Sequence, residues 1–177
     1  MLIELLRSRR SIRQFQKKAI EPEKIDILVE AALRSPTSRG LNPWEFIFVS
    51  QPDTLEQLAR AKAHGSSFLK NAALAVVVCA HPDTSDVWIE DTSIASIILH
   101  LTAADLGLGS CWVQIRKREH DAATSAEAFV RKLLGIDPSL AVEAIIGIGY
   151  PAESKPGHDR TKLLDERISK EQFGVKG

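Results

Sequence analysis

A cluster of cationic and hydroxyl side chains lies near the N-terminus, in the segment Arg9-Arg10-Ser11-Ile12-Arg13. In an extended segment alternate side chains share a face, so Arg9, Ser11 and Arg13 would point the same way and Ile12 toward the core. Guanidinium and hydroxyl groups that converge in this way suit a phosphate monoester, because they offer charge-assisted, bidentate hydrogen bonds. The spacing alone also suits a solvated basic patch, which is the commoner role of charge clusters.

A second candidate is the polar segment at residues 35–44, Ser-Pro-Thr-Ser-Arg-Gly-Leu-Asn-Pro-Trp. It supplies hydroxyl groups, an amide and a flexible backbone directly before a predicted strand. Loops of this kind present hydrogen-bond donors to polar ligands. The same residue types are also what ordinary loops consist of, so this segment alone is a weak indication.

A third candidate is Gly107-Leu108-Gly109-Ser110-Cys111-Trp112, in which the glycines allow close approach of the backbone to a neighbour or a flat ligand. It lacks the third glycine of a dinucleotide-binding GxGxxG motif, and a helix precedes it rather than follows. The pair Gly147 and Gly149 fails in the same way. We therefore expect neither a Rossmann site nor a P-loop.

Other catalytic chemistries lack their motifs. The five histidines show no HExxH and no paired metal spacing, so no metal site is expected. Cys79 and His81 share one face of a strand, but no third ligand is evident. No GxSxG segment indicates a serine hydrolase. Cys111, next to Trp112, is more typical of packing than of a nucleophile, and His100 is expected to be a hydrogen-bonded core residue.

Apolar runs predict the elements that position these residues. Strands are expected at 44–49, 74–80, 110–115 and 141–149, and the run at 74–80 (LAVVVCA) is typical of a strand covered on both faces. Short helices are expected from Leu2 and from Pro22 to about Arg34.

Three further helices are expected. Asp53 and Glu56 resemble a capping box for a helix that ends near Gly65, and Thr124 and Glu127 resemble another, for a helix that ends at Gly135. The third, residues 88–106, is apolar nearly all round, which predicts a buried central helix. Helices and strands alternate irregularly, which favours an α+β layered fold.

Bulk properties narrow the class of protein. The chain has 177 residues, the length of one domain, with residues 150–177 a polar C-terminal extension. Its 23 basic and 23 acidic residues cancel, so no attraction to nucleic acid is expected. No signal peptide is evident, and residues 94–101, the most apolar stretch, are too short to span a membrane. We expect a cytoplasmic protein.

Four segments occur in a characteristic order: RRSIRQF, SPTSRGLNPWEF, DLGLGSCW and GIGYPAE. Together they resemble the nitroreductase family, over residues from about Leu2 to Leu164. The resemblance implies a layered fold with a central, mostly antiparallel sheet flanked by helices and a long buried central helix. It also implies a homodimer with FMN at the subunit interface and a C-terminal extension that packs on the partner as a swapped tail.

The resemblance assigns cofactor contacts residue by residue. The ribityl phosphate would be held by the arginine-serine segment, and the loop before the first strand would contribute from the other subunit. Backbone after the GLGSCW segment would lie near the reactive edge of the flavin, and a basic residue after GYP would complete the phosphate site. The residues concerned are Arg9, Arg10, Ser11, Arg13, Pro36, Thr37, Ser38, Asn42, Val113, Gln114, Ile115, His158 and Arg160, with Arg160 the best match after GYP. Gly40 departs from the family's loop pattern, because it has no side-chain amide.

The implied activity is a two-step reaction in which flavin N5 takes a hydride from NAD(P)H and the reduced flavin then reduces a nitro compound or quinone. The flavin does the chemistry, so no side-chain acid or base is expected to be indispensable. Relatives that perform dehalogenation, ring oxidation or flavin breakdown remain alternatives, as does a flavin-binding protein without turnover.

Overall fold

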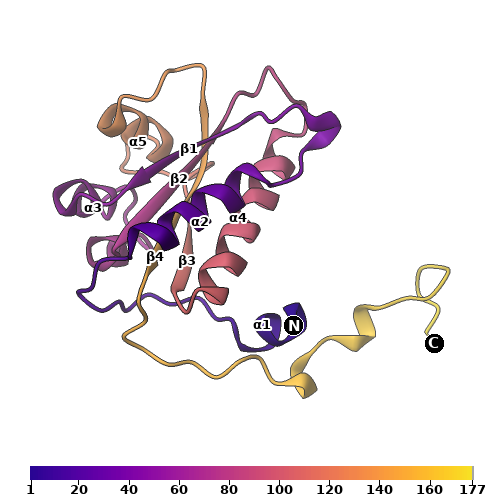
Figure 1. Ribbon diagram of the computed structural model, residues 1–177. Helices are drawn as coiled ribbons and strands as arrows, with labels where there is room; N and C mark the ends of the chain where they lie inside the picture. Colours follow the sequence, from indigo (N-terminus) through magenta and orange to yellow (C-terminus); the bar gives the residue numbers. More distant parts are fainter. Residues whose placement is uncertain (177) are drawn as a thin grey trace.

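The computed structural model describes residues 1–176 and is built on a four-stranded sheet. Its strands are β1 (Trp44–Val49), β2 (Leu74–Ala80), β3 (Gly109–Gln114) and β4 (Ala141–Gly149), in the order β1-β2-β4-β3 (Figure 1). Every neighbouring pair is antiparallel. The two central strands, β2 and β4, are buried along their whole length, which is why their sequences are almost continuously apolar.

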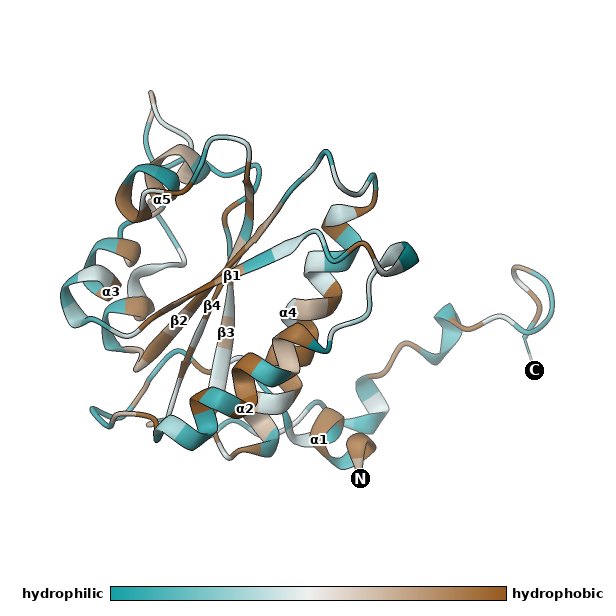
Figure 2. Cartoon of the chain, turned by 45° about the horizontal axis from the view of Figure 1, so that its top comes forward, coloured by the Kyte–Doolittle hydropathy of each residue, from teal (hydrophilic) through white to brown (hydrophobic). Residues whose placement is uncertain are grey.

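Helices cover both faces of the sheet. The helices α2 (Pro22–Leu33) and α4 (Trp88–Asp105) pack together on one face, and α3 (Pro52–Leu58) and α5 (Ala126–Leu134) lie on the other (Figure 2). One apolar cluster joins Leu28, Leu99 and Ile146 on the first face. The other cluster includes Leu58 and Ile145. The layered α+β fold expected from the sequence is confirmed.

The strand predictions are accurate, whereas both predicted capping boxes are wrong. The helix α3 begins after Gln51 without a side-chain cap and ends at Leu58, after which the chain turns as far as a 3-10 helix at Ser67–Asn71. The cap of α5 is Ser125, whose hydroxyl accepts the Ala128 N–H at 3.1 Å. Gly135 ends α5 in the left-handed conformation at φ 66°, as expected.

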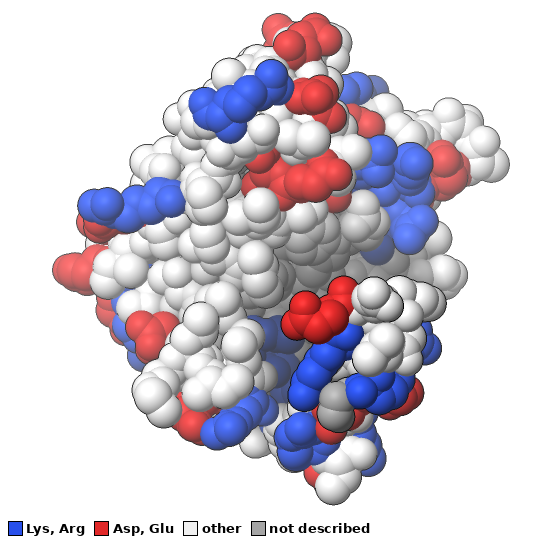
Figure 3. All heavy atoms as spheres, turned by 90° about the vertical axis from the view of Figure 1, so that its right-hand side faces the viewer, with Lys and Arg blue, Asp and Glu red and all other residues white. Residues whose placement is uncertain are grey.

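The helix α4 is buried on one face only, which corrects the expectation of burial all round. Small and polar residues such as Ala95, Ser96 and His100 face the sheet, while Ile94 and Ile97 are 39% and 43% exposed. Seen from the right of Figure 1, a broad area without charged side chains lies between charged ones (Figure 3). The sequence of α4 therefore carries apolar residues on both faces, although the rest of the chain buries only the face toward the sheet.

The C-terminal segment leaves the body of the fold. After Pro151 it passes the first helix, α1 (Leu2–Ser8), and then projects outward with two 3-10 turns, Arg160–Lys162 and Asp165–Arg167 (Figures 1 and 2). Its large apolar side chains are exposed: Leu163, Leu164, Ile168, Phe173 and Val175. None of the helices in residues 1–176 is both long and apolar enough to cross a membrane.

Candidate functional site

The arginine-rich segment runs alongside the edge strand β3. Ser11 pairs with Ser110 in an isolated parallel bridge, and the Ile12 N–H donates to the Ser110 carbonyl at 3.0 Å. The Ile12 side chain is buried, as predicted. Gly109 makes this approach possible, because a Cβ there would lie 2.8 Å from the Ile12 Cβ. Gly109 therefore allows the arginine-rich segment to pack against the start of β3.

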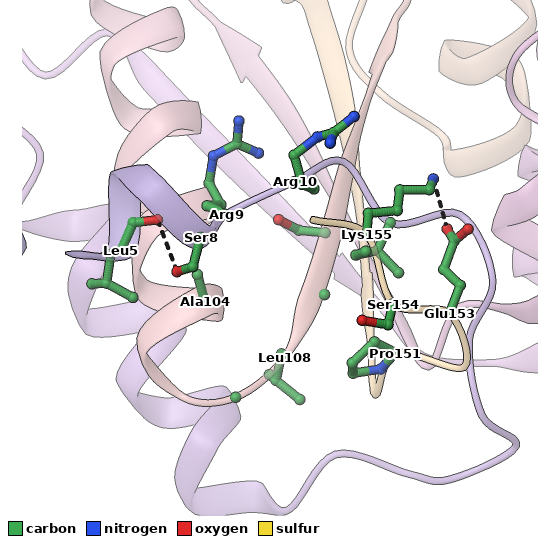
Figure 4. A pocket seen from close by; sticks show the side chains of 14 residues that line it. Leu5, Ser8, Arg9, Arg10, Ala104, Leu108, Pro151, Glu153, Ser154 and Lys155 are labelled. Atoms are coloured by element: carbon green, nitrogen blue, oxygen red, sulfur yellow. Dashed lines mark hydrogen bonds and ion pairs between the residues drawn. The ribbon is translucent and has the colours of Figure 1, made fainter. Parts of the chain in front are cut away.

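A hollow of about 260 Å³ opens where this segment meets the end of α4 and the start of the tail. Arg9 and Arg10 come from the chain after α1, and Lys155 comes from the tail (Figure 4). Residues 107–110, the turn from α4 into β3, also line it. Among the described residues, the guanidinium groups of Arg9 and Arg10 form no ion pair, so two cations face the hollow without a carboxylate partner.

Lys155 is a site residue that the sequence analysis missed. Its ammonium group donates to the Ser11 carbonyl at 3.1 Å and to Glu153 at 3.0 Å. The Glu153 carboxylate also accepts the Arg13 N–H at 2.6 Å, and this backbone hydrogen bond is the main reason that the pKa of Glu153 is lowered. Glu153 and Lys155 thus fasten the start of the tail to the arginine-rich segment. A lysine soon after GYP was the available signal.

The expected alternation holds for only part of the segment. Ser11 and Arg13 lie near Cys111, whereas the charge of Arg9 acts on His100. Arg9 is the C-cap of α1 and its N–H bonds the Leu5 carbonyl, so the strand-like spacing starts after it. The structure therefore brings Arg9 together with Arg10 at the hollow, rather than with Arg13.

His100 is the hydrogen-bonded core histidine that the sequence predicted. It is 6% exposed, and its Nδ1 lies 2.7 Å from the Ser110 Oγ. Burial, and secondarily the charge of Arg9, lowers the pKa of His100 to about 4. The neutral imidazole thus supports Ser110 from the α4 side. No cluster of metal-binding side chains occurs in the described part of the chain.

The outer edge of β3 offers backbone groups rather than side chains. Since the Ser110 carbonyl points outward to Ile12, alternation turns the N–H groups of Trp112 and Gln114 to the same open edge. The side chains of Val113 and Ile115 are fully buried. Gln114 is held by its amide, which accepts the Trp112 indole N–H at 3.0 Å and donates to the Arg116 carbonyl at 3.1 Å.

The polar loop before β1 lies at the other end of α4. Its Thr37 hydroxyl accepts the Asn42 N–H at 3.0 Å, and the Ser38 N–H donates to Asp91 at 2.8 Å. Pro36 and Asn42 are exposed. Asp91 lies in the first turn of α4, whereas Ala104, which lines the hollow, lies near its last turn. The two are thirteen positions apart on the helix, a rise of roughly 20 Å, so one chain does not bring this loop to the hollow.

The two remaining predicted contacts also lie away from the hollow. Arg160 is exposed and forms an ion pair with Asp165 at 2.9 Å, and His158 is exposed on the tail. Neither lines the cavity.

Comparison with known proteins gives consistent matches. A family model described as "Nitroreductase family" matches residues 6–91 and 61–150. An Archaeoglobus fulgidus protein named "Putative NADH dehydrogenase/NAD(P)H nitroreductase" is 32% identical over 97% of this chain and 98% of its own length. The solved structure of an FMN-dependent nitroreductase from Clostridium difficile R20291 is 41% identical, with a TM-score of 0.95 over 97% of this chain and 99% of that one. The NADPH:FMN oxidoreductase of Vibrio harveyi, complexed with NAD+, shares the fold at 21% identity, with a TM-score of 0.81 over 99% and 79% of the two chains.

Proposed function

The chain belongs to the nitroreductase family, and from this premise we propose that it is an FMN-dependent oxidoreductase that takes a hydride from NAD(P)H and reduces a small aromatic acceptor. The observation that carries the proposal is the hollow at the start of β3, where Arg9, Arg10 and Lys155 meet beside an open strand edge. Cations for a phosphate and backbone donors for a polar ring thus lie next to each other.

The donor set fits FMN. Arg9 and Arg10 supply the charge that a ribityl phosphate dianion requires, and Lys155, which is paired with Glu153, adds a third donor at the hollow. Ser11 and Arg13, which do not line the hollow, remain proposed phosphate contacts. The outward N–H of Gln114 supplies a fixed donor for the ring, with Val113 and Ile115 packed behind it. When bound, FMN supplies the hydride chemistry, with NAD(P)H as reductant and a nitro compound or quinone as acceptor.

No side chain is needed as a nucleophile. Burial raises the pKa of the Cys111 thiol, and Arg13 opposes this only in part, so the reactive thiolate form is disfavoured. The part of the polypeptide is to bind the phosphate, to orient the ring along β3 and to keep its donors in place.

A second copy of the chain would complete the site. The loop that carries Pro36, Thr37, Ser38 and Asn42 lies roughly 20 Å from the hollow along α4 in one chain, so we assign it to the hollow of the partner. The exposed Ile94 and Ile97 of α4 and the apolar side chains of the projecting tail would be covered in such a homodimer. His158 and Arg160 on this tail remain proposed phosphate contacts.

The deciding experiment is an absorption spectrum of the purified protein after FMN is added and the excess removed. We expect about one flavin per chain, bleached anaerobically by NADH or NADPH and reoxidised by a nitroaromatic compound or quinone. A protein that does not bind FMN would refute the proposal. Bleaching without reoxidation by these acceptors would favour dehalogenation, ring oxidation or flavin breakdown, and bound FMN that no reductant bleaches would favour a binding protein.

A further inference from the structure

A buried carboxyl group lies directly behind the open edge of β3. Glu143, on the central strand β4, is only 4% exposed. Its Oε2 atom is buried and has no hydrogen-bond partner among the described residues. Removing a carboxyl group from water without full compensation costs free energy of folding. An acid at this position therefore requires a reason other than packing.

The local backbone brings Glu143 next to the end of β3. In the ladder between β2 and β4, Val78 is opposite Ala144 and Cys79 is opposite Val142, so Glu143 is the extra residue of a bulge. Bulges redirect side chains and are frequent next to active sites. The Glu143 carbonyl accepts two N–H groups, from Ile115 at 3.2 Å and Arg116 at 3.0 Å, where β3 ends.

Gln114 of β3 lies beside Glu143 in the sheet. Gln114 is opposite Ala144, the neighbour of Glu143, and its side chain favours the ionised form of the Glu143 carboxyl. The Gln114 amide links the Trp112 indole to the Arg116 carbonyl. An amide nitrogen has two N–H groups, so one can serve Arg116 and the other Glu143. The second N–H of Gln114 is thus available to the buried Glu143 carboxyl beside it.

The charged groups around Glu143 come from two elements. Arg116, in the segment after β3, favours the ionised carboxylate, while Glu127 of α5 disfavours it. Glu127 itself is paired with Arg131 at 2.8 Å. Burial has the largest effect and raises the pKa of Glu143 above its usual value. The neutral acid consequently persists to higher pH than an exposed glutamate would.

We propose that Glu143 is a positioning residue: by holding the Gln114 amide from the core side, it fixes the outward N–H of Gln114 against the flavin ring. The proposal rests on the proposed function, because it is FMN that this edge would face. A carboxyl group that is left without a full set of partners in a core, beside a binding edge, fits a residue kept for function at the expense of stability.

The first test replaces Glu143 by leucine and by glutamine, with Glu127→Gln as a control that removes a nearby carboxylate without touching Gln114. We expect Glu143→Leu to unfold at the same or a higher temperature than the original protein and to bind FMN with a shifted visible spectrum and a kcat lowered about tenfold. Glu143→Gln, which keeps an amide contact to Gln114, should retain most of the kcat. Glu127→Gln should leave the spectrum and kcat unchanged.

The second test needs no turnover. Trp112 emission in the FMN-free protein reports on the Gln114 amide that its indole contacts. We expect this emission to titrate in the original protein and in Glu127→Gln, and to lose the titration in Glu143→Gln and Glu143→Leu. Trp112→Phe identifies the signal among the three tryptophans.

Two results would overturn the inference. One is a folded Glu143→Leu protein with unchanged spectrum, kcat and emission. The other is a loss of kcat that only follows a loss of folded protein, with the Trp112 titration intact in Glu143→Gln. Failure of the original protein to bind FMN would instead refute the proposed function, and the Trp112 titration would still decide whether Glu143 acts on Gln114.

Discussion

The tail carries two cationic side chains that could bind the phosphate. The hollow points to Lys155, whereas the family resemblance assigns Arg160. Both are paired, Lys155 with Glu153 and Arg160 with Asp165, but only Lys155 lines the hollow. We expect Lys155→Met to weaken FMN binding roughly 10- to 100-fold, the scale of one hydrogen bond to a charged group. Arg160→Met should weaken FMN binding less, because Arg160 lies outside the hollow and its charge is shared with Asp165. Flavin fluorescence titration of both variants measures this, and the reverse order would mean that the tail folds back onto the site.

His100 should make the fold sensitive to acid. The pKa of His100 is about 4 in the folded protein, below the usual 6.5, so between these values the unfolded chain binds more protons. The contribution of His100 to the free energy of unfolding is complete above pH 6.5. It is lost as the pH falls toward 4, by about 3 kcal/mol at most. Urea unfolding from pH 7 to pH 4 measures the loss. His100→Gln should flatten this part of the profile, and His158→Gln, at an exposed position, should not.

At the residue scale, the sequence predicted which side chains are buried or charged better than it predicted which of them lie together. Ile12 and His100 were correctly expected in the core, because an apolar residue within a charged run and a histidine within an apolar helix both indicate burial. The grouping of Arg9 with Arg10 was not predictable from alternation, since it depends on where α1 ends. Lys155 was missed because its contacts lie 144 residues away, at the Ser11 carbonyl.

At the element scale, the contact between the arginine-rich segment and β3 depends on Gly109. A methyl group there would overlap Ile12, so Gly109→Ala should push the segment away from β3 and cost about 1–3 kcal/mol of stability. FMN affinity should fall with it. Gly135→Ala, which forces alanine into the left-handed conformation but meets nothing within 4 Å, should cost about 1–2 kcal/mol and leave affinity unchanged. Thermal unfolding and flavin titration together distinguish the two effects.

Strand positions were predicted accurately because β2 and β4 are buried on both faces, which leaves little choice of residue type. Helix caps were not predicted correctly, because neighbouring hydroxyl residues give the same sequence pattern. Thr124 and Ser125 both precede α5, and the helix begins directly after Ser125. The bulge at Glu143 also has no sequence signal, since the run from 141 to 149 has one polar residue in an otherwise apolar strand.

At the scale of the whole molecule, the outward face of α4 predicts an assembly. Ile97→Glu would place a carboxylate in the proposed interface, where it has no partner, and should shift the protein toward monomer with loss of FMN. Light scattering after size-exclusion chromatography measures the mass. Lys132→Glu on α5, on the opposite layer, should change neither mass nor cofactor content. A monomeric original protein that still binds FMN tightly would contradict the proposed dimer.

The loop at Asn42 and the hollow at Arg9 lie at opposite ends of α4 in one chain. If two chains share one flavin as proposed, the amount of bound flavin depends on the concentration of the protein. A cofactor held by two chains must strengthen their association by the same factor by which association strengthens its own binding. Diluting the loaded protein should therefore release flavin, seen as a rise in free-flavin fluorescence, and added FMN should restore the pairing of chains. The flavin absorbance of a dilute sample would then measure the fraction of chains that are in dimers. A flavin content that does not depend on protein concentration would contradict a cofactor shared by two chains.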